Sequence, residues 1–67
     1  MTPDEYANRR VAELIAECIH NARDREMLYA NLVDGVSYGE LADQYHLTYD
    51  GVKKIMRKGK KEVFRHY

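Results

Sequence analysis

The chain lacks the features that would place it outside the class of small globular proteins. It has a single cysteine, Cys18, among 67 residues, so no intrachain disulfide is possible and nothing indicates an oxidising compartment. No segment approaches the roughly 20 consecutive apolar residues of a membrane span. The first ten residues, MTPDEYANRR, lack the apolar core of a secretion signal. From these absences we expect a cytoplasmic protein with no membrane partner.

The chain also lacks the motifs of an enzyme or a metal protein. Its three histidines, His20, His46 and His66, do not combine with Cys18 in a metal-ligand spacing. No motif pairs a nucleophile with a base. We therefore expect no catalytic residues, no metal, no cofactor and no enzymatic activity.

Apolar residues instead recur at helical spacing, and no segment shows the alternation of a strand. Thr2 and Glu5 form a capping box around Pro3, which suits the first position of a helix. This first helix is expected to extend to about His20. Its apolar stripe comprises Ala7, Val11, Leu14, Ile15, Cys18 and Ile19.

Two further helices are expected before the basic end of the chain. Asn21 caps the second helix, and Gly35 supplies the left-handed residue at its end. Ser37, with Glu40 three residues later, begins a short third helix that ends near Tyr45. The apolar residues of the second helix are Met27, Leu28, Leu32 and Val33.

The fourth helix extends over about 48–64, with Thr48 as its cap. A glycine inside a helix costs about 1 kcal/mol relative to alanine, so Gly59 needs an explanation. We expect it to allow a close approach to the first helix, and the alternative is that the helix bends there. The residues on the inward side are Val52, Ile55, Met56, Gly59 and Val63.

These elements predict an all-α fold, a compact four-helix domain formed by residues 1–67. A supporting helix over about 3–20 is expected beside a tri-helical unit over about 21–64. A chain this short buries only about 60% of its unfolded surface. Its stability therefore depends on good helix packing or on pairing with a second copy.

The net charge is zero, but the charges are segregated along the chain. Residues 1–47 contain four basic and nine acidic side chains, a net charge of −5. Residues 48–67 contain seven basic and two acidic side chains, a net charge of +5. The basic end favours a polyanionic partner, and the acidic part helps to orient it.

Residues 38–57, YGELADQYHLTYDGVKKIMR, fit the template of a helix-turn-helix unit. Ala42 is small where the two helices would pass most closely. A basic segment, KGKKEVFRHY, follows directly. The apolar residues stand where two short helices would face each other: Leu41, Tyr45, Leu47, Val52 and Ile55.

The wider stretch over about 21–62 resembles the promoter-reading C-terminal domain of bacterial sigma factors, and it is also similar to LuxR-type regulators. The motifs that carry the resemblance are Arg23-Asp24-Arg25-Glu26, Gly35-Val36-Ser37, Glu40-Leu41-Ala42, Leu47-Thr48 and Val52-Lys53. Two positions depart from the pattern. His46 stands where glycine is usual, so it must be left-handed or the turn must differ. Gly51 stands where a bulkier polar residue is common.

The resemblance implies a sequence-specific protein that binds double-stranded DNA and regulates transcription, with its recognition helix over about 48–64 in the major groove. The residues expected at base edges are Tyr49, Asp50, Lys53 and Arg57. The residues expected at phosphates are Ser37, Tyr38, Thr48, Lys54, Lys58 and Lys61. Two other interpretations stay open. In one, Asp50 serves only to stabilise the first turn of its helix. In the other, Tyr38 serves only to pack against its neighbours.

A protein-interaction module is the alternative function. Helix-turn-helix folds also bind proteins. Such a module would mimic a sigma domain, assist RNA polymerase or antagonise a nucleic-acid-binding protein. Its gene could belong to a mobile element. The acidic first half and exposed aromatics such as Tyr6, Tyr29 and Tyr67 favour it. Because a single module buries only about 600–1,000 Å² on DNA, we also expect a homodimer, formed through the first helix or through Phe64 and Tyr67.

Overall fold

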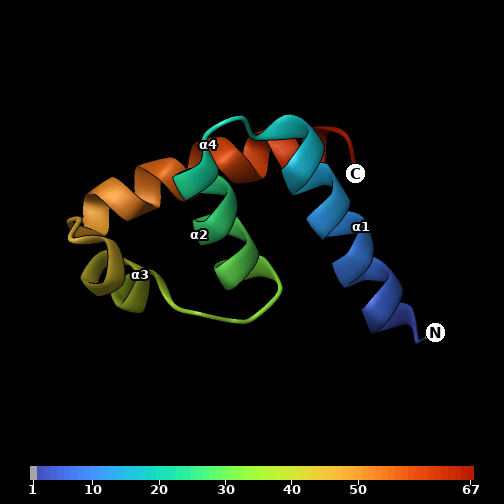
Figure 1. Ribbon diagram of the computed structural model, residues 1–67, viewed down its shortest axis with the longest axis horizontal. Coiled ribbons are helices and arrows are strands. Elements are labelled where there is room, and N and C mark those ends of the chain that lie inside the picture. Colours follow the sequence, from blue (N-terminus) through green and yellow to red (C-terminus); the bar gives the residue numbers. More distant parts are fainter. Residues whose placement is uncertain (1) are drawn as a thin grey trace.

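Four helices make up residues 2–67, the part of the chain that the computed structural model describes. They are α1 (Pro3–Cys18), α2 (Ala22–Leu32), α3 (Tyr38–Tyr45) and α4 (Tyr49–Arg65), and no strand occurs in these residues (Figure 1). The predicted all-α fold class is confirmed. Within the same residues, no helix combines the length and the apolar character of a membrane span.

Each helix begins at its predicted capping residue. At the start of α1, Glu5 N donates to Thr2 Oγ1 (3.2 Å) while Thr2 N donates to Glu5 Oε2 (3.1 Å). The other three helices begin at Asn21, Ser37 and Thr48, whose side-chain oxygens each accept the amide three residues later. These bonds satisfy amides that have no partner inside the helix, so the starts are determined locally.

Arg25 holds the corner between α1 and α2. Its Nη1 donates to the backbone carbonyls of Ile19 (3.0 Å) and His20 (3.1 Å). Ile19 adopts an extended backbone (φ −105°, ψ 116°). As a result α1 ends at Cys18, two residues before the predicted His20.

The loop between α2 and α3 is longer than the sequence predicted. α2 ends at Leu32, and Gly35 takes the expected left-handed conformation (φ 75°) within the loop rather than at the helix end. Asn31 Nδ2 donates to Val36 O at 2.8 Å, and Val36 N donates to Ala30 O at 3.0 Å. These bonds fold the loop back onto α2, and α3 starts at its own cap, Ser37.

α4 is the longest helix and packs against the three others. Figure 1 shows it along one edge of the molecule, with α3 near its start, α1 near its end and α2 between them. α1 also packs on α2, but its N-terminal part extends away from the other helices. This overhang accounts for a radius of gyration of 11.7 Å, slightly above the value of about 11 Å for a compact chain of this length.

The core lies where α4 meets the other helices. Fully burying a large aliphatic side chain contributes about 1.5–3 kcal/mol, so the apolar stripe of α4 is a main anchor of the fold. Ile55 of that predicted stripe is only half-buried, and the rest of the stripe is buried as expected. The buried apolar residues are Leu14, Ile15, Ile19, Met27, Leu28, Leu41, Ala42, Val52, Met56 and Val63.

Gly59 marks a close approach of α4 to a neighbouring helix. A Cβ atom at this position would lie 2.5 Å from Leu28 Cδ1 and 3.0 Å from Leu28 Cγ, and Leu28 is fully buried. The expected close approach is present, but its partner is α2 and not α1. The prediction of the partner was wrong because the spacing shows that Gly59 points inward without showing which helix covers it.

We expect Gly59→Ala to lower the free energy of unfolding by up to about 2 kcal/mol. Alanine is the better helix former by about 1 kcal/mol, but overpacking a core costs about 1–3 kcal/mol. Gly39→Ala in α3 is the matched control, because the nearest atom to a Cβ there is Ser37 Oγ at 3.9 Å, and it should be more stable than the parent protein. Urea denaturation measures both changes. An equal gain for Gly59→Ala would contradict the tight contact with Leu28.

A turn of three residues, His46–Thr48, joins α3 to α4. His46 is left-handed (φ 56°, ψ 42°), which confirms the first of the two alternatives for this position. The amides of His46 and Leu47 both donate to Ala42 O, the second at 2.9 Å. The chain therefore reverses tightly after α3, and it does so with a side chain that disfavours the required conformation.

His46→Gly should raise the free energy of unfolding by about 0.5–1 kcal/mol. The left-handed conformation costs a residue with a side chain about 1–2 kcal/mol, and the greater freedom of glycine in the unfolded chain offsets part of the gain. His46→Ala is the control, since it removes the imidazole without relieving the backbone. Thermal or urea unfolding of the pair measures the difference, and equal stabilities would mean that the turn carries no strain.

Candidate functional site

Seven of the eleven basic side chains of the protein belong to α4. Four of them lie on one side of the helix: Lys53, Arg57, Lys60 and Lys61. With 3.6 residues per turn, their side chains leave the axis within an arc of about 100°. That arc adjoins the buried stripe, so α4 has one apolar side and one strongly positive side.

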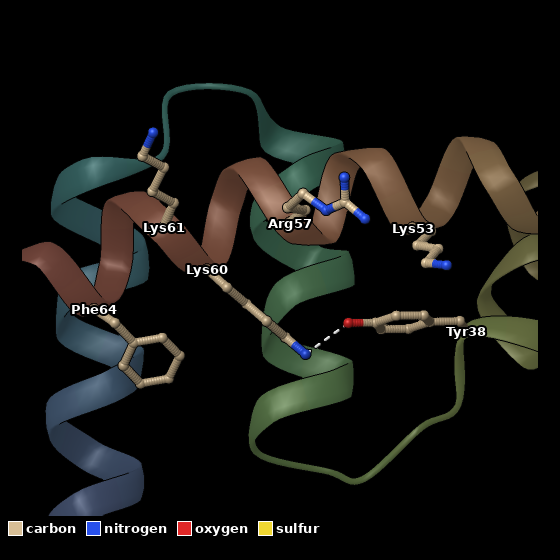
Figure 2. Close-up of a pocket in the computed structure, with 6 residues that line it drawn as sticks. All are labelled: Tyr38, Lys53, Arg57, Lys60, Lys61 and Phe64. Atoms are coloured by element: carbon tan, nitrogen blue, oxygen red, sulfur yellow. Dashed lines mark hydrogen bonds between the residues drawn. The ribbon is translucent and has the colours of Figure 1, made fainter.

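These four side chains border an open cleft of about 490 Å³ together with two aromatic residues. The six residues, here named the cationic cleft, are Tyr38, Lys53, Arg57, Lys60, Lys61 and Phe64 (Figure 2). Tyr38 is the first residue of α3, and the other five belong to α4. In Figure 2 the rings of Tyr38 and Phe64 lie on either side of Lys60, while Lys61 is directed away from them.

Tyr38 fixes Lys60 at the centre of the cleft. Lys60 Nζ donates to the Tyr38 hydroxyl at 2.6 Å (Figure 2), and both residues are half-buried. The same nitrogen lies 5.0 Å from the centroid of the ring, but it meets the ring at its hydroxyl edge, so the hydrogen bond is the main interaction. Bonds from a charged donor are stronger than bonds between neutral groups. This bond joins α3 to α4.

The ring of Tyr38 also packs against Tyr49, the first residue of α4. The ring centroids are 6.2 Å apart and the planes are tilted by 56°, a favourable geometry for an aromatic pair. Tyr38 thus contacts α4 at its start and, through Lys60, three turns further along. The ring of Tyr38 therefore packs against α4, as one of the two interpretations expected. Its hydroxyl, in addition, accepts a hydrogen bond from Lys60 in the cleft.

No carboxylate forms an ion pair with the cationic cleft within residues 2–67. The cations of the cleft lie within or near a Debye length of one another, about 10 Å at 0.1 M salt. No direct ion pair offsets their mutual repulsion, and an anionic partner would reduce it. The ion pairs in this part of the chain are the surface contacts Arg10–Glu13, Arg23–Asp24 and Arg65–Glu62.

The remaining predicted site residues lie outside the cleft. Ser37 Oγ and Thr48 Oγ1 accept helix amides as caps, at 3.2 and 3.0 Å. Tyr49 and Asp50 are exposed in the first turn of α4. These four residues therefore gather at the starts of α3 and α4, where helix dipoles favour an anion.

Lys54 and Lys58 are exposed and do not line the cleft. Lys54 precedes Lys61 by seven residues, so it lies at the edge of the same side of α4. Lys58 follows Lys53 by five residues, so its side chain leaves the axis about 140° away from that of Lys53. It borders a different cavity, next to Asn21 and Asp24 at the corner between α1 and α2. The structure thus separates Lys58 from the cationic cleft, although the sequence grouped it with Lys61.

Sequence reasoning missed two residues of the cleft, Lys60 and Phe64. Lys60 follows Lys53 by seven residues, and Phe64 follows Arg57 by seven. Residues two turns apart share a side of a helix, so this spacing was a usable signal. What the sequence could not show was that Tyr38, from another helix, would complete the cleft.

Tyr45 links α3 to α2. Its hydroxyl donates to Glu26 Oε2 at 3.1 Å. Partial burial, together with the hydrogen bond to this carboxylate and its charge, raises the pKa of Tyr45 above its ordinary value. The phenol is therefore protonated at neutral pH, and Tyr45 serves packing between helices rather than the cleft.

Comparisons of the chain with family models, with curated proteins and with solved structures found no match. The resemblance to sigma-factor and LuxR-type domains therefore depends on the motif residues alone.

Tyr38→Phe removes only the hydroxyl that accepts the bond from Lys60. We expect it to lower the free energy of unfolding by about 0.5–1.5 kcal/mol, and Lys60→Met to cause a comparable loss. In a double-mutant cycle the two losses should not add, because each variant breaks the same bond. Tyr6→Phe on α1 is the control, since Tyr6 is 63% exposed. Additive losses in urea denaturation would show that the hydroxyl and the ammonium act independently.

Proposed function

We propose that this protein binds double-stranded DNA sequence-specifically and acts as a transcriptional regulator. The observation that carries the proposal is the row of four cations on one side of α4, none of which pairs with a carboxylate in the described part of the chain. Lysines and arginines that neutralise DNA phosphates release counterions, which supplies much of the affinity for nucleic acid. The net charge of the chain is zero, but the local field along this side of α4 is positive.

The length and surface of α4 support docking in the major groove. The helix has 17 residues and is about 25 Å long. Its diameter with side chains is about 10–12 Å, and the major groove, about 12 Å wide, admits a helix of that diameter. The exposed first turn carries Tyr49 and Asp50, and Lys53 and Arg57 follow on the same side. In this docking the N-terminal half of α4 reaches base edges, and the C-terminal half extends past the groove.

The arrangement of α3 and α4 supports a helix-turn-helix mode of binding. The two helices pack on each other and are joined by three residues. Leu41 of α3 and Val52 of α4 are fully buried, and Ala42 is nearly so. In this mode the first helix crosses the DNA backbone, and the start of α3, with Ser37 and Tyr38, holds a phosphate.

The chemistry of the exposed side chains assigns them different roles. Asp50 accepts a hydrogen bond from a cytosine amino group, and Lys53 and Arg57 donate to guanine N7 and O6. Lys54 and Lys61 neutralise phosphates. If about five phosphates are neutralised in total, the logarithm of the affinity falls with the logarithm of the salt concentration with a slope of about −4 to −5.

We expect Lys53→Ala and Arg57→Ala each to weaken binding to duplex DNA by about 1–3 kcal/mol and to relax the base preference. Lys61→Ala should weaken binding to all sequences alike, because a phosphate contact carries no base information. The measurement is fluorescence anisotropy with duplexes selected from a random pool and with shuffled versions of the same duplexes.

Lys58→Ala is the matched control for these variants. It removes the same charge from the same helix, but on the side that borders Asn21 and Asp24. Its loss of affinity should be smaller than that of Lys53→Ala. Equal losses for all the lysine variants, with no change in base preference, would mean that binding reflects net charge alone.

A protein-interaction module is the second candidate, and one observation favours it. An apolar cleft of about 410 Å³ lies between α1 and α2, lined mainly by Ala12, Ile15, Ala16, Tyr29 and Ala30. A second copy of the chain or a subunit of RNA polymerase would bind such a surface. A band-shift with random duplex DNA separates the two candidates. If no binding is found at about 50 mM salt, where phosphate contacts are strong, the protein-interaction function is favoured.

A further inference from the structure

Phe64 is an exposed aromatic residue inside the cationic cleft. Its side chain borders the cleft with Arg57 and Lys60 (Figure 2), and it is 50% exposed. Its ring meets that of Tyr67 edge to face, with centroids 5.9 Å apart and planes at 63°, and Tyr67 is 58% exposed. Neither ring belongs to the buried core, so the pair is available to a ligand.

Phe64 lies beyond the base pairs that the start of α4 would contact. It follows Tyr49 by fifteen residues, which is about 22 Å along the helix axis. A recognition helix contacts base edges through its N-terminal residues, so a residue this far along the axis lies beyond those contacts. Docking of the N-terminal half of α4 in the groove therefore leaves the aromatic pair unused.

The groups around Phe64 favour a nucleotide over an apolar ligand. Lys60 precedes Phe64 by four residues and so lies on the same side of α4, where Tyr38 holds it. An apolar partner covering Phe64 would desolvate this ammonium without compensating its charge. A nucleotide satisfies both groups, because its base stacks on an aromatic ring and its phosphate neutralises a cation.

We propose that Phe64 and Tyr67 form a stacking platform for an unpaired nucleobase whose phosphate contacts Lys60. The protein then prefers a duplex with an adjoining single-stranded segment over a fully paired duplex. This inference rests on the proposed function, since nucleic acid is the ligand in both. It adds a second binding position at the other end of α4.

The first test compares two DNA probes by fluorescence anisotropy. One is a blunt duplex of about 20 base pairs, and the other carries in addition a single-stranded extension of about five thymidines. The parent protein should bind the extended probe about tenfold more tightly, as expected for one or two stacked bases. Phe64→Ala should remove that gain and leave the affinity for the blunt duplex nearly unchanged. Tyr6→Ala, at an exposed aromatic on α1, should keep the gain.

The second test uses fluorescence to detect stacking directly. The chain contains no tryptophan, so Phe64→Trp introduces a single reporter that retains an aromatic ring. Its emission should be quenched by the extended probe and much less by the blunt duplex. Tyr6→Trp is the control and should show no quenching with either probe. This readout does not depend on whether Phe64→Ala alters stability.

The outcomes separate the two proposals. Tight binding of the blunt duplex with no gain from the extension, or a gain that Phe64→Ala retains, overturns the stacking site and leaves the proposed function standing. Binding of the single-stranded segment without binding of the blunt duplex overturns the proposed function and leaves the stacking site. Binding of neither probe overturns both.

Discussion

The burial of one stripe of α4 is the constraint on which the rest of the molecule depends. Val52, Met56, Gly59 and Val63 are buried, and α4 packs against each of the other helices. Because this stripe occupies one side of a long helix, the seven basic residues of α4 stay outside the core. Gly59 tightens the packing by admitting the side chain of Leu28 close to the helix axis. The same packing that stabilises the fold therefore presents the positive surface.

Polar contacts at the edge of the core then shape that surface. The bond from Lys60 to Tyr38 places an ammonium beside the start of α3, and the contact of Tyr38 with Tyr49 aligns the start of α4. Holding like charges close together costs energy in the free protein. An anionic partner would offset this cost, and Lys60, which Tyr38 already holds, would lose less entropy on binding than a flexible lysine.

The parts of the fold that could be predicted are those determined over three or four residues. The caps at Thr2, Ser37 and Thr48 were predictable because a side-chain oxygen and an amide three residues later lie close in any helix start. The end of α1 was not, because the carbonyls that follow it bond to Arg25, a residue of the next helix. For His46 the sequence left two alternatives, a left-handed backbone or a different turn, and the tertiary structure shows the left-handed backbone.

The sequence by itself determined where helices start, which side of each is apolar and that positive charge collects at the C-terminal end. These properties follow from spacing along a regular helix. Tertiary structure decided which residues meet across helices: that Gly59 faces Leu28, that Tyr38 contacts Lys60, and that Lys58 is separated from the cationic cleft. The physical reason is that periodicity specifies the direction of a side chain relative to its own axis, whereas its partners depend on how the axes cross.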